Sequence, residues 1–373
     1  MLRSFIVALL LLCLPAVSRA QVPEAPASLW RQSNDRITFT TADLSVPKNP
    51  GVVRFTRTFA FPHEEEGLDS GLQFESEDHQ VFASLYVYFP GLPHAGISAF
   101  ATDWAIRTQS QNLRPLGTRI ASAGGRDGAA IRADYSNFRD GLATSAAFIK
   151  VGGWILKLRV SGPEARRADV EATMAALLDG LRFEGSLQPR AAAPLDITDC
   201  EVPIAAAARP VPEDNAHMVI DSFIANFDGA GTDARDDHGR RVEALPGRVH
   251  PQWCRSTRAR IRDSTLFILR AAPGAASGGV DGGSVMLVPV NDAGTIAELV
   301  QTEAHRFLLL YHKIGRTLVL GSYDGVLTDE QIADILSGAD QAGTRIRTTV
   351  VHRTNGNSDI QLSLPPDGTR RRN

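Results

Sequence analysis

Residues 152–183 read GGWILKLRVSGPEARRADVEATMAALLDGLRF, and this stretch decides the fold class of the chain. Its first part, WILKLRV, alternates apolar and basic side chains, which is typical of an antiparallel strand with one buried face. Its second part carries apolar residues at helical spacing, namely Val170, Met174, Leu177, Leu178 and Leu181. Pro163 suits the first turn of that helix, and Gly180 suits its end. The stretch therefore predicts a sheet that is covered by a helix.

A second stretch, IGRTLVLGSYDGVLTDEQIADIL at residues 314–336, repeats this order of strand, loop and helix. A shift of 162 residues aligns the two stretches without a gap and places Gly315 on Gly153. Thr328 and Gln331 have the spacing of a capping box at the start of the second helix. We interpret the repeat as a degenerate duplication of one fold. The alternative is chance, because a hairpin followed by a helix is a common unit.

Apolar periodicity predicts further elements around these two stretches. Those of the first part are strands at 81–89, 127–135 and 142–151 and a helix with Ile97, Phe100 and Trp104 on one side. Those of the second part are a strand at 284–290, a helix at 295–301 and a strand at 306–313. The predicted fold class is α+β, with mainly antiparallel sheets covered by helices.

Length and composition predict two domains. A single core rarely grows beyond about 250–300 residues, and a segment rich in proline and alanine interrupts the chain near its middle. The expected parts are a signal peptide at 1–20, a first α+β domain at 21–184, a connector at 185–215, a second α+β domain at 216–362 and a disordered tail at 363–373.

The first residues, MLRSFIVALLLLCLPAVSRA, have the pattern of a secretory signal peptide. Arg3 precedes an apolar run, and the small residues Ser18 and Ala20 predict cleavage after Ala20. The run is too short to span a membrane, and no later run approaches the length of a span. We therefore expect export to the periplasm or the exterior and no transmembrane segment.

The charge balance argues against one class of partner. The chain has 39 basic and 42 acidic residues, and loss of Arg3 and Arg19 with the signal peptide changes the net charge from −3 to −5. A dedicated nucleic-acid-binding domain carries a basic excess. We therefore expect no nucleic-acid partner.

Two cysteines, Cys200 and Cys254, remain after cleavage. An even pair in an exported chain favours a disulfide. Two alternatives stay open, namely a pair of unbonded thiols and a catalytic thiol. The second arises because His250 precedes Cys254 closely, and a histidine can lower the pKa of a thiol.

The stretch RSTRARIR, residues 255–262, would place Arg258, Arg260 and Arg262 on one face of a strand, because side chains alternate. Like charges that lie side by side repel one another, so this face favours an anion. A phosphate-bearing ligand, an acidic partner or anionic lipid headgroups would fit. The alternatives are neutralisation by the acidic loop at 233–237 and a solvated face.

The sequence contains no recognisable motif of a catalytic, metal or cofactor site. The loop DARDDHGRR (233–241) lacks the residue order of a calcium loop, and PHEEEG (62–67) lacks the second histidine of a zinc-binding helix. His305 and His312 are seven residues apart and would point to opposite faces of a strand. We therefore predict no metal, no cofactor and no catalytic residue.

The segment GLATSAAFIKVGGWILKLRVSGPEARRADVEATMAALLDGLRF, residues 141–183, resembles the end of PsbP-like α-β-α sandwich domains. In those domains a long antiparallel pair of strands leads into a covering helix. The resemblance is one of topology and includes no specific motif. It implies a non-catalytic module for assembly or binding.

These features lead to three hypotheses about function. The preferred one is a non-catalytic exported binding or envelope-assembly module that works at a cleft between the domains. The second is a periplasmic hydrolase whose catalytic residues converge only in the fold. The third is a structural interaction protein of an envelope complex, marked by a broad exposed apolar patch. A cluster of histidine, carboxylate and nucleophile would favour the hydrolase, and an open groove with aromatics and arginines would favour binding.

Overall fold

The computed structural model of the chain describes only part of its sequence. The described residues are 23–63, 67–139, 141–185, 187–200, 207–212, 215–226, 249, 252–261, 264–271, 283–338 and 348–362. The expected signal peptide and the expected tail both lie outside them. No helix in these ranges is long and apolar enough to cross a membrane.

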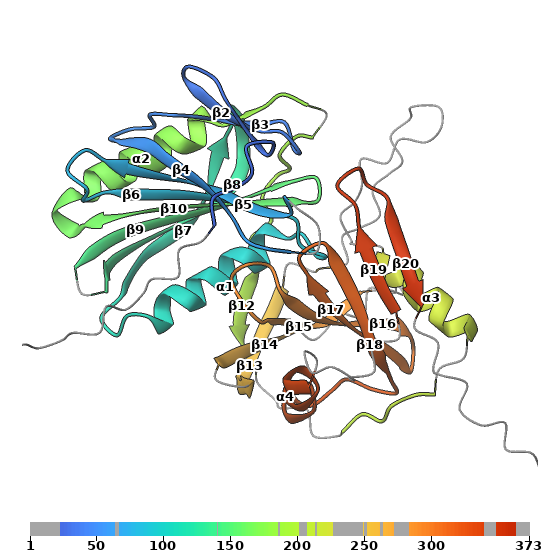
Figure 1. Ribbon diagram of the computed structural model, residues 1–373. Coiled ribbons are helices and arrows are strands. Elements are labelled where there is room, and N and C mark those ends of the chain that lie inside the picture. The colour runs from blue at the N-terminus through green and yellow to red at the C-terminus, as the bar shows by residue number, and fades with distance from the viewer. Residues whose placement is uncertain are drawn as a thin grey trace, which may run out of the picture.

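The N-terminal half is built on a seven-stranded antiparallel sheet in the order β4-β5-β6-β10-β9-β8-β7. Its strands are β4 (Val53–Ala60), β5 (Asp69–Ser76), β6 (Phe82–Tyr88), β7 (Arg114–Ala123), β8 (Arg126–Phe138), β9 (Leu142–Val151) and β10 (Trp154–Pro163). A smaller sheet comprises β1 (Trp30–Gln32), β2 (Arg36–Phe39), β3 (Leu44–Pro47) and β11 (Arg182–Phe183). This smaller sheet and helix α2 (Arg167–Gly180) cover one face of the large sheet (Figure 1).

The predicted apolar stripe of α2 is confirmed. Val170, Met174, Leu177 and Leu178 are at most 3% exposed, and they pack in one core with apolar residues of both N-terminal sheets. The start of the helix differs slightly from the expectation. A 3₁₀ turn, η1 (Glu164–Arg166), follows Pro163, so the α-helix begins one turn later.

The C-terminal half is built on a nine-stranded sheet whose order, β12 to β20, follows the sequence. Its strands are β12 (Asp196–Asp199), β13 (Gln252–Ile261), β14 (Ser264–Ala271), β15 (Ser284–Pro289), β16 (Ile296–Glu303), β17 (Arg306–Lys313), β18 (Arg316–Tyr323), β19 (Thr348–His352) and β20 (Ser358–Leu362). Among the described strands of this sheet, only β12 runs parallel to its neighbour. Helix α4 (Asp329–Gly338) covers one face of this sheet, and helix α3 (Asn215–Asn226) packs on the other.

The capping box predicted at the start of α4 is confirmed. The backbone N–H of Thr328 donates to Gln331 Oε1 at 3.1 Å, and the backbone N–H of Gln331 donates to Thr328 Oγ1 at 3.2 Å. The two side chains thereby satisfy backbone donors that a helix end leaves without partners. This local chemistry explains why the second helix begins where the sequence indicates.

The helix predicted at 295–301 is wrong, because these residues belong mainly to strand β16. All residues from Ile296 to Val300 are buried, since β16 pairs with β15 and β17 and both faces of the sheet are covered. A short apolar run that is buried on both faces has the same composition as a buried helix segment. Strand pairing with distant neighbours therefore overrides the local pattern.

The two large sheets share their ending but not their strand order. In both, a hairpin leads into a covering helix, as β9–β10–α2 and as β17–β18–α4. In the N-terminal sheet, however, β6 pairs with β10, because the chain crosses through α1 to the far edge. The nine-stranded sheet has no such crossover. The duplication therefore stays a prediction that rests on the shared ending.

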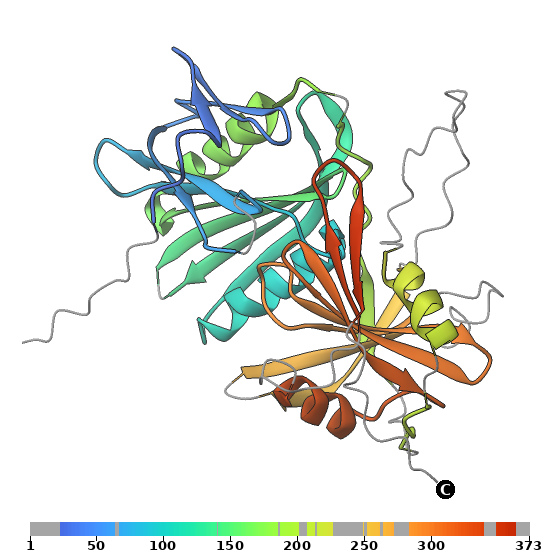
Figure 2. The same cartoon turned by 45° about the vertical axis from the view of Figure 1, so that its right-hand side comes forward.

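Helix α1 (Ala95–Thr108) lies between the two large sheets (Figures 1 and 2). Ala95 packs against Ile131 and Phe148 of the N-terminal sheet. Ile97 and Phe100 belong to a second cluster with apolar residues of β14, β15 and β16. The side predicted from Ile97 and Phe100 is thus confirmed as apolar, but α1 is buried on its opposite side as well. It fills the region where a cleft between the halves is expected.

Direct contacts join the two halves beside α1. The backbone N–H of Gly91 donates to the Lys313 carbonyl at 2.8 Å, and the N–H of Gly315 donates to the Phe89 carbonyl at 2.7 Å. Lys157 Nζ lies 2.5 Å from Asp292 Oδ2, and burial lowers the pKa of this lysine. We refer to these contacts together as the joint.

Part of the Pro/Ala-rich segment is packed against the N-terminal sheet. The backbone N–H groups of Arg190 and Ala192 donate to the carbonyls of Lys150 and Gly128 at 3.1 and 2.7 Å. The chain then enters β12 and joins the other large sheet. The described part of this segment therefore connects the halves through regular hydrogen bonds.

His94 makes the stability of the fold depend on pH. Its Nδ1 accepts the backbone N–H of Ile97 at 3.3 Å and caps α1, so this nitrogen carries no proton. Burial, together with the nearby charge of Lys150, lowers the pKa of His94 from 6.5 to about 4. The unfolded chain therefore binds more protons in this window, and the stability that is present above pH 6.5 decreases as the pH falls towards about 4.

We expect His94→Asn to reduce this pH dependence, because asparagine keeps a capping oxygen but does not titrate. The measurement is the Tm of wild type and variant at several pH values across this window. His79→Asn is the control, because the His79 side chain is exposed on a turn and its backbone φ is +55°, a conformation that asparagine tolerates. Parallel Tm curves for wild type and His94→Asn would contradict the prediction.

Candidate functional site

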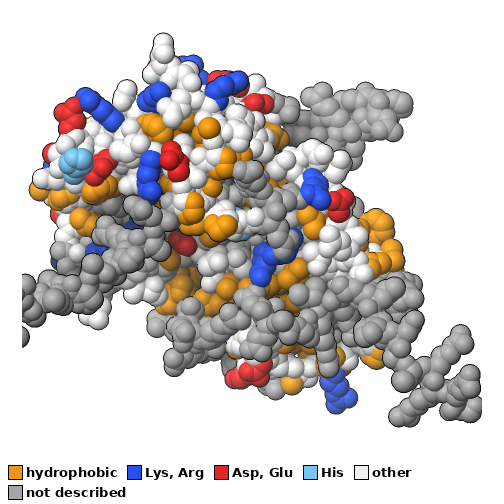
Figure 3. Space-filling view, in the orientation of Figure 1, with side chains coloured by type: hydrophobic (Ala, Val, Ile, Leu, Met, Phe, Trp, Pro, Cys, Tyr) orange, Lys and Arg blue, Asp and Glu red, His pale blue; other side chains and the backbone are white. Residues whose placement is uncertain are grey.

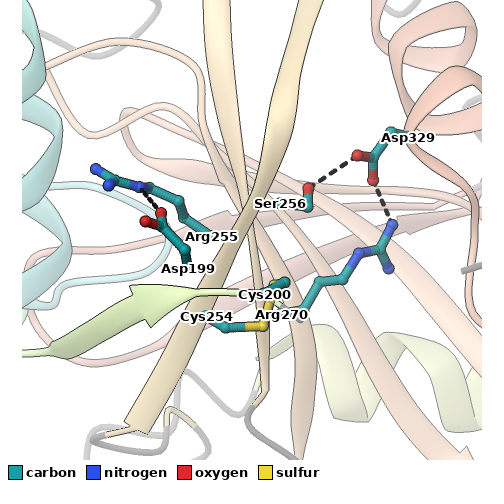
Figure 4. Close-up of a disulfide and its surroundings, with 7 residues drawn as sticks. All are labelled: Asp199, Cys200, Cys254, Arg255, Ser256, Arg270 and Asp329. Atoms are coloured by element: carbon teal, nitrogen blue, oxygen red, sulfur yellow. Dashed lines mark hydrogen bonds and ion pairs between the residues drawn. A yellow bond between two sulfur atoms is a disulfide. The ribbon is translucent and has the colours of Figure 1, made fainter. Parts of the chain in front are cut away.

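Cys200 and Cys254 are joined by a disulfide, as the sequence predicts, with a Cα–Cα distance of 4.8 Å. The bond links the end of β12 to β13, beside an ion pair between Arg255 and Asp199 at 2.6 Å (Figure 4). With its sulfur in this bond, Cys254 is not a thiol nucleophile. His250, the residue that raised the catalytic alternative, lies outside the described residues.

The arginine-rich strand face predicted from Arg258, Arg260 and Arg262 is only partly described. The backbones of Arg258 and Arg260 lie in β13, in register with Phe267 and Thr265 of β14. Their side chains and the whole of Arg262 lie outside the described part of the chain. The acidic loop at 233–241 lies outside it as well. The structure therefore gives the place of this strand but leaves its anion-binding face a prediction.

Acid–base side chains converge in a row that crosses six neighbouring strands, and we call it the polar row. Its members, from β15 to β20, are Ser284, Glu298, His312, Thr317, His352 and Ser358. His312 Nε2 lies 2.8 Å from Glu298 Oε2, and His312 Nδ1 lies 2.9 Å from Thr317 Oγ1. Carboxylate, imidazole and hydroxyl thus follow one another in the order of a hydrolytic triad.

The triad-like centre of the polar row is closed to substrate. Glu298, His312 and Thr317 are each 0% exposed. Gly91 lies directly over Thr317, since a Cβ on Gly91 would come within 2.7 Å of Thr317 Oγ1. A nucleophile must contact its substrate, so this arrangement does not support the hydrolase alternative. Among the described residues, no group of three or more His, Cys, Asp and Glu side chains is placed to hold a metal ion.

An open pocket of about 370 Å³ lies at the C-terminal end of α1. It is lined by Trp104, Arg107, Thr108, Ser110, Gln111 and Leu113. The lining combines an indole ring, a guanidinium and several hydroxyl and amide groups. We call it the α1 pocket.

The guanidinium of the α1 pocket is held in place. Arg107 Nε donates to Asp103 Oδ2 at 2.6 Å, and Tyr135 Oη donates to the other oxygen of Asp103 at 2.9 Å. The bond to Asp103 raises the pKa of Arg107, and burial raises the pKa of Tyr135. Arg107 is therefore a fixed cation whose side chain is 45% exposed.

Aromatic and arginine side chains flank the α1 pocket on both sheets. On the C-terminal sheet, the Trp104 ring meets the Phe267 ring at 4.4 Å, and Arg255 lies 5.2 Å from the centre of the same phenyl ring. Because the backbone of Arg258 pairs with Phe267, the predicted arginine-rich strand runs beside this pocket. The structure thus brings the pocket and that strand together.

Two further arginines lie on the N-terminal sheet and contact one aromatic ring. Arg139 and Arg159 lie 5.2 and 4.9 Å from the centre of the Phe138 ring. Arg139 also donates through its backbone N–H to Ser110, which lines the α1 pocket. Burial lowers the pKa of Arg159. Cations stacked on aromatic rings thus surround the end of α1 on both sides.

Charged side chains of both signs are mixed on one face of the molecule. On the face shown in Figure 3, acidic and basic side chains of the described residues are mixed, and neither kind forms a broad patch there. A nucleic-acid-binding face carries clustered lysine and arginine.

The comparisons with known proteins identify no family. No protein-family model matches the chain, and no curated protein matches it. Among solved structures, the chain is similar to a crystal structure from Bacteroides thetaiotaomicron VPI-5482 at 1.50 Å resolution, with 9% sequence identity and a TM-score of 0.23. The match covers 59% of this chain and 66% of that chain, which is just under two thirds of its length. A likeness at this level indicates neither a family nor a function.

The α1 pocket was not predicted from the sequence, although the spacing of four of its residues is a signal for it. Trp104, Arg107, Thr108 and Gln111 are spaced by three, one and three residues, which places them along one stripe of a helix and its continuation. A stripe that mixes an indole, a cation, a hydroxyl and an amide is unusual for a core face. The pattern alone does not show that this stripe remains open.

We expect removal of the disulfide to destabilise the fold without unlinking the two sheets. The cysteines are 54 residues apart, and a loop of this length corresponds to about 4 kcal/mol on the loop-entropy estimate. The measurement is urea unfolding of wild type and of the double variant Cys200→Ser, Cys254→Ser, with and without reductant. Reductant should lower the unfolding midpoint of the wild type and leave the variant unchanged. Free alkylatable thiols in the untreated exported protein would contradict the bond.

Proposed function

We propose that this chain is an exported, non-catalytic binding protein whose ligand site is the α1 pocket. The observation that carries the proposal is the contrast between two sites. The pocket presents an aromatic ring and a fixed cation at the surface, whereas the polar row with catalytic character is buried. Binding residues are therefore accessible, and acid–base residues are not.

The chemistry of the lining favours a small ligand with an anionic group and a flat apolar face. Arg107 supplies charge-assisted donors, which are stronger than neutral ones. Trp104 supplies a large flat surface for the apolar face. The volume of about 370 Å³ falls at the lower end of the range of small-molecule sites. Gln111 and Thr108 add polar groups that would orient the ligand.

Export is supported by two independent features. The first residues have the pattern of a signal peptide. The Cys200–Cys254 disulfide is typical of an oxidising compartment. The resemblance of residues 141–183 to PsbP-like domains fits a non-catalytic role. Periplasmic or secreted localisation is therefore part of the proposal.

The test uses three probes that separate the charge from the apolar face. Phenyl phosphate has both features, inorganic phosphate has only the anion, and phenol has only the ring. We expect isothermal titration calorimetry to show that phenyl phosphate binds more tightly than either other probe. Arg107→Gln should weaken phenyl phosphate binding by about tenfold, since a charge-assisted hydrogen bond is lost.

Arg54→Gln is the matched control for this substitution. Arg54 is also a surface arginine in an ion pair, with Glu77 at 2.6 Å, but it lies on β4, away from the pocket. We expect the control to bind phenyl phosphate as the wild type does. Equal affinities of the two variants, or no binding of phenyl phosphate by the wild type, would refute the proposed site.

A second candidate function, a structural interaction protein, is favoured by one surface. Helix α3 exposes Val219, Ile220 and Phe223 by 46, 50 and 55%, while its Asp221 and Ser222 are buried. Strand β20 carries further exposed apolar residues. A helix that turns apolar residues outward is typical of a surface for another protein.

We expect Phe223→Ser to abolish recovery of any protein partner that is cross-linked to the chain in its native envelope. The readout is mass spectrometry of the purified cross-linked complex. Phe82→Ser is the control, because Phe82 is 42% exposed but belongs to the N-terminal sheet. The same partner recovered equally with both variants would exclude the α3 surface as its binding site.

A further inference from the structure

The polar row is continuous from a half-buried end to a buried end. At the half-buried end, Ser358 Oγ lies 3.4 Å from His352 Nδ1, and His352 Nε2 lies 2.8 Å from Thr317 Oγ1. The 2.9 Å contact from Thr317 to His312 and the 2.8 Å contact from His312 to Glu298 complete the path. Ser284 Oγ donates to the other oxygen of Glu298.

With Glu298 ionised and both histidines neutral, the proton count gives each hydrogen bond in this path one direction. The Thr317 hydroxyl has one proton, so it donates to one histidine and accepts from the other. An ionised Glu298 only accepts, so His312 carries its proton on Nε2 and accepts from Thr317 through Nδ1. His352 then donates to Thr317 from Nε2 and accepts from Ser358 through Nδ1. All donors in this first state point towards Glu298.

We propose that the polar row is a two-state proton wire that carries one proton from the His352 end to Glu298. A proton binds to Nδ1 of His352, and the Nε2 proton of His352 passes to Thr317. Thr317 passes its own proton to Nδ1 of His312, and the Nε2 proton of His312 passes to Glu298. One proton enters, no other group is released, and Glu298 changes from ionised to neutral.

The second state keeps every hydrogen bond of the path with its direction reversed. Glu298 then donates to His312 Nε2, His312 donates to Thr317, Thr317 donates to His352, and His352 donates to Ser358. Both histidines have changed from the Nε2–H to the Nδ1–H tautomer, and neither is charged. Protonation of His312 alone would instead form a buried ion pair with the ionised Glu298 at 2.8 Å. The concerted change avoids this buried ion pair, because Glu298 and both rings are then neutral.

Charged groups near the polar row lie on the sheet, on helix α3 and in the β15–β16 loop. On the sheet itself these are Arg306, Lys313, Arg316 and Asp359. Arg306 is paired with Asp221 of α3 at 2.7 Å, and Asp359 is paired with Arg353 at 2.5 Å. Helix α3 also carries His217, and the β15–β16 loop carries Asp292, which is paired with Lys157. The Pro90–Gly91 segment over Thr317 has no titratable side chain.

The test is NMR of the full chain with ¹⁵N-labelled histidine, which reads the tautomer of each ring as the pH is lowered. We expect both His312 and His352 to be Nε2–H at neutral pH. Both should change to Nδ1–H with one shared midpoint, and the Glu298 carboxyl carbon should titrate at the same pH. Thr317→Val removes the central hydroxyl, so the two midpoints should separate by about one pH unit or more.

Thr348→Val is the matched control. Thr348 is 1% exposed on β19, and its hydroxyl has no hydrogen-bond partner among the described residues, so its loss should leave the shared midpoint unchanged. An Nδ1–H tautomer or a charged ring at neutral pH in the wild type would overturn the inference. So would separate midpoints in the wild type, unfolding before any tautomer change, or a shared midpoint that persists in Thr317→Val.

Discussion

Helix α1 is the constraint on which the rest of the structure depends, because it must pack against two sheets at once. Its side towards the N-terminal sheet carries small residues such as Ala95 and Ala99, which allow a close approach to Phe148. Its other side carries Ile97 and Phe100, which fill the space next to the C-terminal sheet. A large residue on the first side would push the sheets apart, and a small one on the second would leave a void. This helix therefore fixes the arrangement of the two halves together with the joint.

This arrangement decides which polar residues meet solvent. The joint brings Gly91 over Thr317 and closes the polar row. At the C-terminal end of α1, in contrast, Ile106 packs against the N-terminal sheet while Trp104 and Arg107 line an open pocket. The same packing thus buries the acid–base side chains and leaves Trp104 and Arg107 beside an open pocket. This physical link makes a binding role more consistent with the fold than a hydrolytic one.

Elements whose signal lies in the local sequence were predictable, whereas elements defined by pairing with distant strands were not. The β10–α2 stretch and the capping box of Thr328 and Gln331 follow from spacing and local hydrogen bonds. The cysteine pairing followed from simple counting. Strand β16 was missed because its apolar run has no period, and only pairing with β15 and β17 distinguishes it from a helix. The α1 pocket was missed because the sequence shows a mixed stripe but not its exposure.

The polar row could not be predicted from the sequence either, because its members meet only through the pairing of strands. The same dependence on pairing explains how the row contributes to the fold. Glu298 and His312 lie in strands whose buried residues are mostly apolar, and only the register brings the two side chains within 2.8 Å. Nine strands in sequential order, most of them apolar, are prone to slip against one another, because many registers bury similar surface. A slip of one residue would turn Glu298 into the opposite, apolar face and leave His312 without its acceptor. An unpaired buried carboxylate is far more costly than an imperfect apolar contact. The row therefore penalises wrong registers strongly, so it specifies the sheet even though each of its bonds adds little net stability.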